Sequence, residues 1–316
     1  MRALVTGGAG FIGSNLSDLL LAKGHDVVVL DDLSSGYRQN VPEGVELHLG
    51  NVSNPDAVRT AANRCEVIFH LAASVGNTRS IEDPLHDSEV NLLGTLAVLE
   101  AARSAGIERV VLSSSAGIFG ELKTIPIQED HPTDPDSPYG VSKLAAEKMC
   151  LAYNKLHGMK NVCLRYFNVY GPRQRFDAYG NVIPIFGERL LQGEPIHIYG
   201  DGEQTRDFVN VRDVIQANYL AGTHATASGA YNTGSGSRVT INHLAHMMGE
   251  IAHREARIVH VAARPGDVRD SLACVEHARD EFGFEPEVGL KAGLVEYLDW
   301  LSTDQVTLDR WSAGTI

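Results

Sequence analysis

Short apolar runs alternate with amphipathic segments along the first half of the chain. Residues 3–5 are all apolar, which is typical of a strand buried on both faces of a parallel sheet. Further strands are expected over 26–30, 45–49, 67–71 and 110–112, separated by helices expected over 14–23, 56–63, 87–105 and 139–157. Strands that alternate with helices predict an α/β fold, a Rossmann-type doubly wound parallel sheet with helices on both faces.

The second half of the chain predicts a smaller unit. Amphipathic helices are expected over 211–222, 241–251 and 291–301. We therefore expect a cofactor-binding domain over 1–168 and a smaller C-terminal α/β substrate-binding domain over most of 169–302, with part of 205–240 returning to the sheet. Residues 303–316 show no clear pattern, and we expect this tail to fray.

Three glycines lie between the first strand and the first helix. Gly7 allows a tight turn, Gly10 lets the backbone approach a pyrophosphate, and Gly13 lets the helix pack closely on the strand. Dinucleotide phosphates would then meet backbone N–H groups at a helix N-terminus, where the helix dipole favours negative charge. Asp31 ends the second strand, where an acid binds ribose hydroxyls and repels a 2′-phosphate, so NAD is expected rather than NADP.

Other residues at the carboxyl ends of strands are expected to line the same site, because doubly wound sheets bind ligands there. Small residues after the fourth strand let the backbone lie against a ribose and pyrophosphate, although close packing explains them nearly as well. The positions are Asp32, Leu33, Ser35 and Gly36 after the second strand, Asn51 and Val52 after the third, and Ala72 and Ala73 after the fourth.

A tyrosine and a lysine at helical spacing form the candidate catalytic pair. Tyr139 and Lys143 are four residues apart at the start of an expected helix, so both project from one face. A lysine ammonium and the positive nicotinamide ring of NAD stabilise a phenolate, so we expect the pKa of Tyr139 to be drawn down toward working pH. Ser115, at the end of a neighbouring strand, can hydrogen-bond the same substrate hydroxyl. In isolation, a tyrosine and a lysine at this spacing would be ordinary surface residues of a helix. In a chain that also has a dinucleotide-binding turn, we interpret Tyr139 as a general base.

Charge and cysteine usage narrow the possible partners. Forty acids against 27 lysines and arginines give a formal charge of −13, which argues against nucleic-acid or anionic-membrane binding. No apolar run approaches a membrane span, and Met1–Arg2 leads directly into a strand, so we expect a cytoplasmic protein. The cysteines, which show no metal-ligand spacing and are expected to be free thiols, are Cys65, Cys150, Cys163 and Cys274.

Taken together, the motifs resemble those of a known family, the extended short-chain dehydrogenase/reductases, and within it the sugar-nucleotide 4-epimerases of the UDP-galactose 4-epimerase type. The resemblance runs from residue 6 to about 301. It rests on TGGAGFIG (6–13), DDLSSG (31–36), FHLAA (69–73), SSSAGIFG (113–120), SPYGVSK (137–143), LRYFNVYGPRQ (164–174), GDGEQTRDF (200–208) and RPGDV (264–268).

The resemblance implies an NAD-dependent UDP-hexose 4-epimerase that acts through a transient 4-keto sugar. Ser115, Tyr139 and Lys143 would serve as hydrogen-bond donor, base and cofactor-ribose anchor. It also implies cofactor contacts from Phe11, Ile12, Leu71, Asn91, Ser113 and Tyr166. Substrate contacts are implied for Asn168, Asn181, Val182, Arg206, Arg264 and Asp267 around the nucleotide diphosphate, and for His197 and Tyr199 beside the uracil.

Some positions depart from the family pattern or bear on the sugar. Asn51 replaces the usual acid at the adenine pocket, and Phe119 replaces a usual tyrosine. Ser271 stands at the position that gates the C2 substituent, and a small residue there leaves room for an N-acetyl group, so UDP-GlcNAc/GalNAc are expected beside UDP-Glc/Gal. Arg175 could instead pair with a C6 carboxylate, so UDP-glucuronate is a third possible substrate.

The sequence also bears on two other possible functions and on the oligomeric state. Sugar-nucleotide 4,6-dehydratases and decarboxylases carry an acid beside the strand-end hydroxyl, where this chain has Ala116 and Gly117. A non-catalytic NAD-sensing regulator would not need the intact serine, tyrosine and lysine. In relatives, helices equivalent to 87–105 and 139–157 pair across a two-fold axis, so a homodimer with a four-helix bundle is expected.

Overall fold

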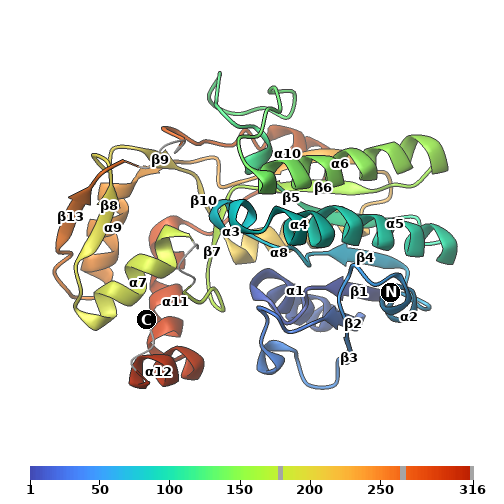
Figure 1. Ribbon diagram of the computed structural model, residues 1–316, viewed down its shortest axis with the longest axis horizontal. Helices are drawn as coiled ribbons and strands as arrows, with labels where there is room; N and C mark the ends of the chain where they lie inside the picture. Colours follow the sequence, from blue (N-terminus) through green and yellow to red (C-terminus); the bar gives the residue numbers. More distant parts are fainter. Residues whose placement is uncertain (177–180, 264–267, 314–316) are drawn as a thin grey trace.

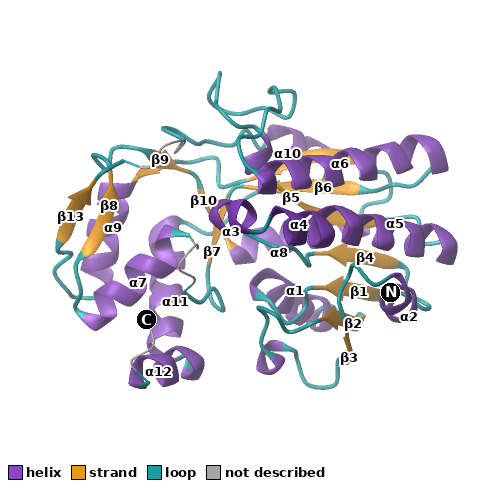
Figure 2. Ribbon diagram, viewed as in Figure 1, coloured by secondary structure: helices purple, strands orange, loops and turns teal. Residues whose placement is uncertain are grey.

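The computed structural model describes residues 1–176, 181–263 and 268–313. Its centre is a seven-stranded sheet in which every neighbouring pair is parallel. This confirms the doubly wound α/β fold, and Figure 2 shows the strands lying between helices. In spatial order the strands are β11 (Gly229–Thr233), β6 (Val162–Tyr166), β5 (Val110–Ser115), β4 (Val67–His70), β1 (Arg2–Thr6), β2 (Asp26–Asp31) and β3 (Glu46–Leu49).

The two faces of the sheet bury alternate residues of each strand. In β1, Ala3 and Val5 pack on one face and Leu4 on the other. Helices α1 (Phe11–Ala22), α8 (Val211–Thr223) and α10 (Glu276–Phe282) cover the first face. The other face is covered by α2 (Pro55–Ala61), α4 (Pro84–Ser88), α5 (Gly94–Ala105) and α6 (Pro138–His157), with α3 (Asn77–Glu82) beside α4 and α6.

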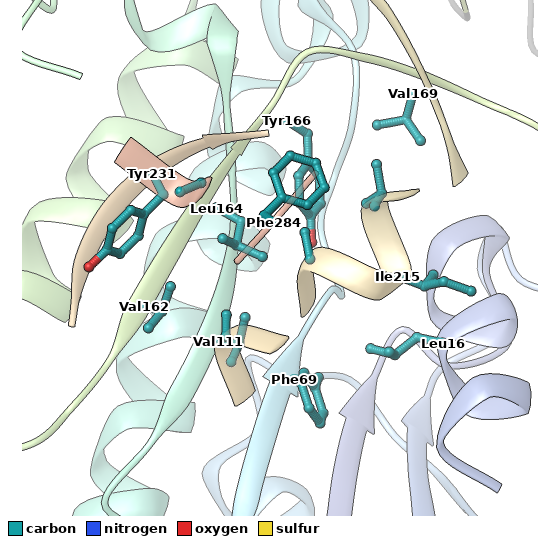
Figure 3. Close-up of a cluster of buried hydrophobic side chains, with 14 of the residues drawn as sticks. Leu16, Phe69, Val111, Val162, Leu164, Tyr166, Val169, Ile215, Tyr231 and Phe284 are labelled. Carbon is teal, nitrogen blue, oxygen red and sulfur yellow. The ribbon is translucent and has the colours of Figure 1, made fainter. Parts of the chain in front are cut away.

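Figure 3 shows the core of the first face. Side chains from α1, α8 and several strands meet there, as expected for strands buried on both sides. The labelled residues are Leu16, Phe69, Val111, Val162, Leu164, Tyr166, Val169, Ile215, Tyr231 and Phe284.

A second lobe with its own apolar core lies beside the sheet (Figure 1). Its strands β8 (Ile196–Tyr199) and β13 (Ile258–Val261) pair in parallel and pack on α7 (Val182–Gln192), α9 (Ile241–Ile251) and α11 (Leu290–Thr303). Two short strand pairs connect this lobe to the sheet: β7 (Asn168–Tyr170) with β10 (Phe208–Asn210), and β9 (Thr205–Arg206) with β12 (Val239–Thr240).

Three segments differ from the expected pattern. The first helix begins at Phe11 rather than Ser14, because the glycine turn itself leads into it. The helix expected over 87–105 is divided by a π turn, Glu89–Leu93. The tail forms helix α12 (Gln305–Ser312), whose N-terminus is capped by Asp304, so the expected fraying is wrong for these residues.

The helices of the described ranges include none with both the length and the apolar character that a bilayer crossing requires.

Candidate active site

The glycine turn joins β1 to α1 at the carboxyl edge of the sheet. Gly7 has φ +70°, and a β-carbon there would lie 2.7 Å from the backbone nitrogen of Ala72. A β-carbon on Gly13 would lie 2.2 Å from the carbonyl oxygen of Gly7. Phe11 and Ile12 form the first turn of the helix. The turn thus presents bare backbone at a helix N-terminus, and this cradle fits the pyrophosphate of a dinucleotide.

Asp31 lies beside this turn and is buried. Its carboxylate accepts hydrogen bonds from the backbone N–H groups of Ala9 at 2.9 Å and Leu33 at 2.8 Å. Burial raises the pKa of Asp31, while these two bonds act to lower it. Each carboxylate oxygen has a further lone pair, so Asp31 can hold the glycine turn and still accept from ribose hydroxyls.

The other expected cofactor positions follow the same edge of the sheet. Asn51 donates from Nδ2 to the carboxylate of Asp32 at 2.8 Å, which links the ends of β2 and β3. A β-carbon on Gly36 would lie 2.8 Å from Ala9, so the loop after β2 also packs on the glycine turn. The remaining positions follow β2, β3 and β4 and are Leu33, Ser35, Val52, Leu71, Ala72 and Ala73.

The candidate catalytic residues come together at the end of β5. Tyr139 and Lys143 lie one turn apart at the start of α6, which Ser137 caps. Ser115 Oγ and the Tyr139 ring lie beside each other next to Gly117. Lys143 is 4% exposed, and its ammonium donates to Ser113 Oγ at 3.4 Å. The geometry places a phenol, a hydroxyl and an ammonium in one site, as a proton-transfer role for Tyr139 requires.

The pKa of Tyr139 differs from the expectation. Burial raises it, the Ser115 hydroxyl acts to lower it, and the negative charge of Asp87 raises it further. Burial also lowers the pKa of Lys143 to about 8, against the charge of Asp87. The protein groups on their own therefore keep the phenol protonated at neutral pH, because burial removes the hydration that the phenolate would need.

Two residues expected to contact the cofactor use their side chains within the protein. Asn91 is 2% exposed, and its amide oxygen accepts from the backbone N–H of Ser74 at 2.9 Å. The hydroxyl of Tyr166 is hydrogen-bonded with Asn218, and the Tyr166 ring lies in the core (Figure 3). These bonds brace the site from within the protein, and contact of the two residues with the cofactor stays a prediction.

Residues expected at the substrate lie on the connecting strands and in the second lobe. Asn168 begins β7 and donates from Nδ2 to the carbonyl of Asp207 at 3.2 Å, and Arg206 ends β9. His197 and Tyr199 lie on the exposed face of β8. Their alternation with buried isoleucines places both side chains on the face of the strand away from the apolar core.

Further substrate positions follow the same connection. Asn181 and Val182 begin α7. Ser271 is 8% exposed, close to a backbone bond in which Ile127 donates to the carbonyl of Leu272 at 2.8 Å. Arg264 and Asp267, also expected to hold the substrate, lie outside the described residues.

Arg175 has a partner within the protein that lies far away in the sequence. Its guanidinium donates to both oxygens of Asp304, at 2.8 and 2.7 Å, and lies 4.2 Å from the ring centroid of Tyr37. The Arg175 and Asp304 side chains are 9% and 6% exposed. The pair uses Nε and Nη2 of Arg175 within the protein, and a role of Arg175 toward a sugar C6 carboxylate stays a prediction.

Several buried polar groups around the site cannot be recognised from the sequence, because a single acid in a helix or loop is usually exposed to solvent. Glu147 on α6 accepts from Ser114 Oγ at 2.7 Å and forms a bidentate pair with Arg165 on β6. Asp207 accepts from the N–H groups of Ser235 at 2.7 Å and Ala273 at 3.0 Å, and so ties together three chain segments near Asn168 and Ser271. Within the described ranges, no cluster of three histidine, cysteine or acidic side chains is arranged to hold a metal.

Comparison with known proteins gives this site a family. The family model for NAD dependent epimerases and dehydratases matches residues 3–234. A UDP-glucose 4-epimerase from Mycolicibacterium smegmatis is 39% identical over 308 residues, which cover 95% of this chain and 98% of that protein.

Solved structures agree over nearly the whole chain. The UDP-glucose 4-epimerase of Thermus thermophilus in complex with NAD superposes with a TM-score of 0.90 at 39% identity, covering 96% of this chain and 99% of that one. The UDP-N-acetylglucosamine 4-epimerase of Methanobrevibacter ruminantium, in complex with UDP-N-acetylmuramic acid, gives a TM-score of 0.92 at 32% identity, covering 96% and 98%. The chain therefore belongs to the NAD dependent epimerase/dehydratase family.

Proposed function

We propose that this protein is an NAD-dependent UDP-hexose 4-epimerase that interconverts UDP-glucose with UDP-galactose and UDP-GlcNAc with UDP-GalNAc. The observation that carries the proposal is the grouping of Ser115, Tyr139 and buried Lys143 at the same sheet edge as the glycine cradle. The similarity to proteins named UDP-glucose and UDP-N-acetylglucosamine 4-epimerases supports the sugar class.

The cofactor would lie along the carboxyl edge of the sheet. Gly7, Gly10 and Gly13 would hold its pyrophosphate, Asp31 would accept from a ribose hydroxyl, and Lys143 would anchor the second ribose. When bound, NAD supplies an acceptor and donor for the C4 hydride and a positive ring charge that favours the phenolate.

Tyr139 would move the proton at O4 of the hexose. The phenolate oxygen accepts that proton as the sugar is oxidised at C4 and returns it when the 4-keto sugar is reduced on its opposite face. Ser115 would hydrogen-bond the same oxygen. Reduction on the opposite face requires the sugar to turn in the site while its nucleotide stays bound.

The second lobe would provide this anchoring. Arg206 and Asn168 would hold the diphosphate and nucleoside, and a guanidinium suits a diphosphate because its donors match two oxygens at once. His197 and Tyr199 would pack on the uracil. Ser271 is small, so a C2 N-acetyl group would be accommodated.

The experiment is an assay of the purified protein with NAD and separate UDP-sugars, with chromatography and mass spectrometry of the products. We expect the paired 4-epimer of equal mass from the glucose and N-acetylglucosamine substrates. Loss of water or carbon dioxide would instead identify a dehydratase or decarboxylase, conversion of UDP-glucuronate alone would identify the uronate epimerase, and no conversion would favour a regulatory protein.

We further propose a homodimer through the flank formed by α4, α5 and α6, which lie side by side in Figure 1. Large apolar side chains are exposed along these helices, which is typical of a surface that another subunit covers. They are Leu85 at 83%, Leu93 at 54%, Val141 at 53% and Leu156 at 75% exposure. Light scattering should give twice the chain mass, and Leu85→Asp with Leu156→Asp should give the monomer.

A cytoplasmic location is also proposed. All four cysteines are free thiols, which suits a reducing compartment. Cell fractionation with an antibody to the chain tests it, and recovery in a membrane or secreted fraction would contradict it.

A further inference from the structure

A buried acid lies beside the Tyr139–Lys143 pair. Asp87, in helix α4, is 0% exposed. One carboxylate oxygen accepts from Asn91 Nδ2 at 3.0 Å, and the other accepts from Ser142 Oγ at 2.5 Å. Both donors are neutral, so neither of these two contacts brings a positive charge to Asp87.

The π turn Glu89–Leu93 brings a third element to this acid. Such turns are rare and occur often at functional sites. Here Nδ2 of Asn91, with two N–H donors, lies within hydrogen-bond distance of Asp87 at 3.0 Å, of the carbonyl oxygen of Ser74 after β4 at 3.0 Å, and of Ser142 Oγ at 3.1 Å. Asp87 is therefore connected to β4, α4 and α6 at one point.

Ser142 connects Asp87 to the catalytic pair. It directly precedes Lys143, and its hydroxyl also lies 3.0 Å from the carbonyl oxygen of Tyr139. Movement of the Asp87 carboxylate would shift the first turn of α6, on which both catalytic side chains stand.

We propose that Asp87 is a positioning residue for the reaction: its buried carboxylate is the counter-charge of Lys143, and through Ser142 it fixes the first turn of α6. The inference rests on the proposed function only where turnover is measured. It adds to the family triad a charge that sets the pH range in which the triad works.

The charges around the pair make the direction of the effect clear. Asp87 raises the pKa of both Tyr139 and Lys143, against the burial that lowers Lys143 to about 8. His70 on β4 also faces Lys143, but burial lowers its pKa to about 3, so it stays neutral at working pH. The thiols of Cys150 and Cys163 face Lys143 from α6 and β6, and contact with Cys150 and burial raise the pKa of Cys163. Loss of the Asp87 charge should therefore lower both catalytic pKa values together.

Two matched variants separate the charge from the hydrogen bond. Asp87→Asn removes the charge but can still bond Asn91 and Ser142, whereas Ser142→Ala removes the bond and keeps the charge. In Asp87→Asn, both limbs of the pH profile of kcat/KM should move to lower pH by about one unit. In Ser142→Ala, the maximum value of kcat/KM should fall several-fold, while both limbs of the profile stay at the same pH.

A titration without turnover provides the second readout. The ultraviolet absorbance of tyrosinate, taken as the difference between each protein and its Tyr139→Phe counterpart, reports the pKa of Tyr139 directly. It should be lower in Asp87→Asn than in the parent and unchanged in Ser142→Ala. If Asp87→Asn does not fold, Asp87→Ser carries the same test.

The proposal would be overturned if a folded Asp87→Asn or Asp87→Ser protein kept both limbs of the kcat/KM profile and the pKa of Tyr139 where they are in the parent. If the titration moves but no UDP-sugar is converted, the role of Asp87 stands and the proposed function fails.

Discussion

Arg165 and Arg175 each form a bidentate pair with a buried carboxylate, but they lie in different parts of the molecule. The Arg165–Glu147 pair lies inside the first lobe and joins β6 to α6. Its carboxylate also accepts a hydrogen bond from the hydroxyl of Ser114, the neighbour of Ser115. The Arg175–Asp304 pair joins the loop after β7 to the cap of α12 and stacks on Tyr37 from the loop after β2.

The difference separates two kinds of support. The first pair holds the elements that carry the catalytic trio in one rigid unit. The second holds the two lobes together beside the glycine turn, where Arg173 also pairs with Asp18 of α1 at 2.7 Å. Breaking the first should therefore damage the fold and chemistry together, while breaking the second should loosen ligand retention and leave the chemistry intact.

The largest effect on activity is expected from a change in the catalytic residues of the first lobe. Tyr139→Phe removes the group that takes the O4 proton, so kcat should fall by about 10²–10⁴-fold while KM for the UDP-sugar stays within about twofold. Steady-state kinetics on both proteins check this. A variant with near-normal kcat would remove Tyr139 from the mechanism.

Removal of one partner of the internal pair should cost the most stability. Arg165→Met leaves Glu147 charged and unpaired at 0% exposure, so the free energy of unfolding should fall by about 3–5 kcal/mol. Urea denaturation measures it. Arg103→Met, which breaks an exposed pair with Glu100, is the control and should change stability by less than about 1 kcal/mol. Equal losses in the two variants would contradict the account.

The pair between the lobes should show a smaller effect of another kind. Asp304→Asn keeps a side chain that can cap α12 but removes the charge that Arg175 needs, so NAD should leave the protein several-fold faster with kcat at saturating NAD little changed. Release is measured by dialysis of the loaded protein and assay of the retained dinucleotide. Asp309→Asn, on the same helix, is the control. Retention equal to the parent would show that this pair does not govern the cofactor site.

The smallest effect is a pH dependence of the same pair. Burial acts to raise the pKa of Asp304, but hydrogen bonds from Arg175 and Thr307 outweigh it and the pKa is lowered. A lowered pKa adds stability that is present above the unfolded value of 3.8 and is lost as pH falls through the folded value. The difference in thermal unfolding between the parent and Asp304→Asn should therefore shrink below about pH 4. A constant difference down to pH 2 would contradict the pairing.

The same comparison shows what the sequence could predict. The strands and helices of the first lobe follow local apolar periods, and the glycine turn has a backbone reason at each position, so both were predictable. The catalytic spacing of Tyr139 and Lys143 on a helix was predictable for the same reason. The π turn was not, because one extra residue at Glu89–Leu93 leaves the apolar pattern of 87–105 almost unchanged.

The contacts between distant segments could not be predicted. Arg175 and Asp304 are far apart in the chain, and Asp304 lies in a tail with a weak apolar pattern whose helix depends on tertiary partners. Asp87 and Glu147 are acids on helices, where solvent exposure is the usual outcome. Only the folded structure shows that both are buried.

The fate of the hydrogen at C4 tests the central claim most directly. UDP-glucose carrying deuterium at C4 would be converted by the NAD-loaded protein in ordinary water, and the product examined by nuclear magnetic resonance. Removal and return of the same hydride predicts UDP-galactose that keeps the deuterium at C4. Replacement of that deuterium by solvent hydrogen, or a product of altered mass, would contradict the account.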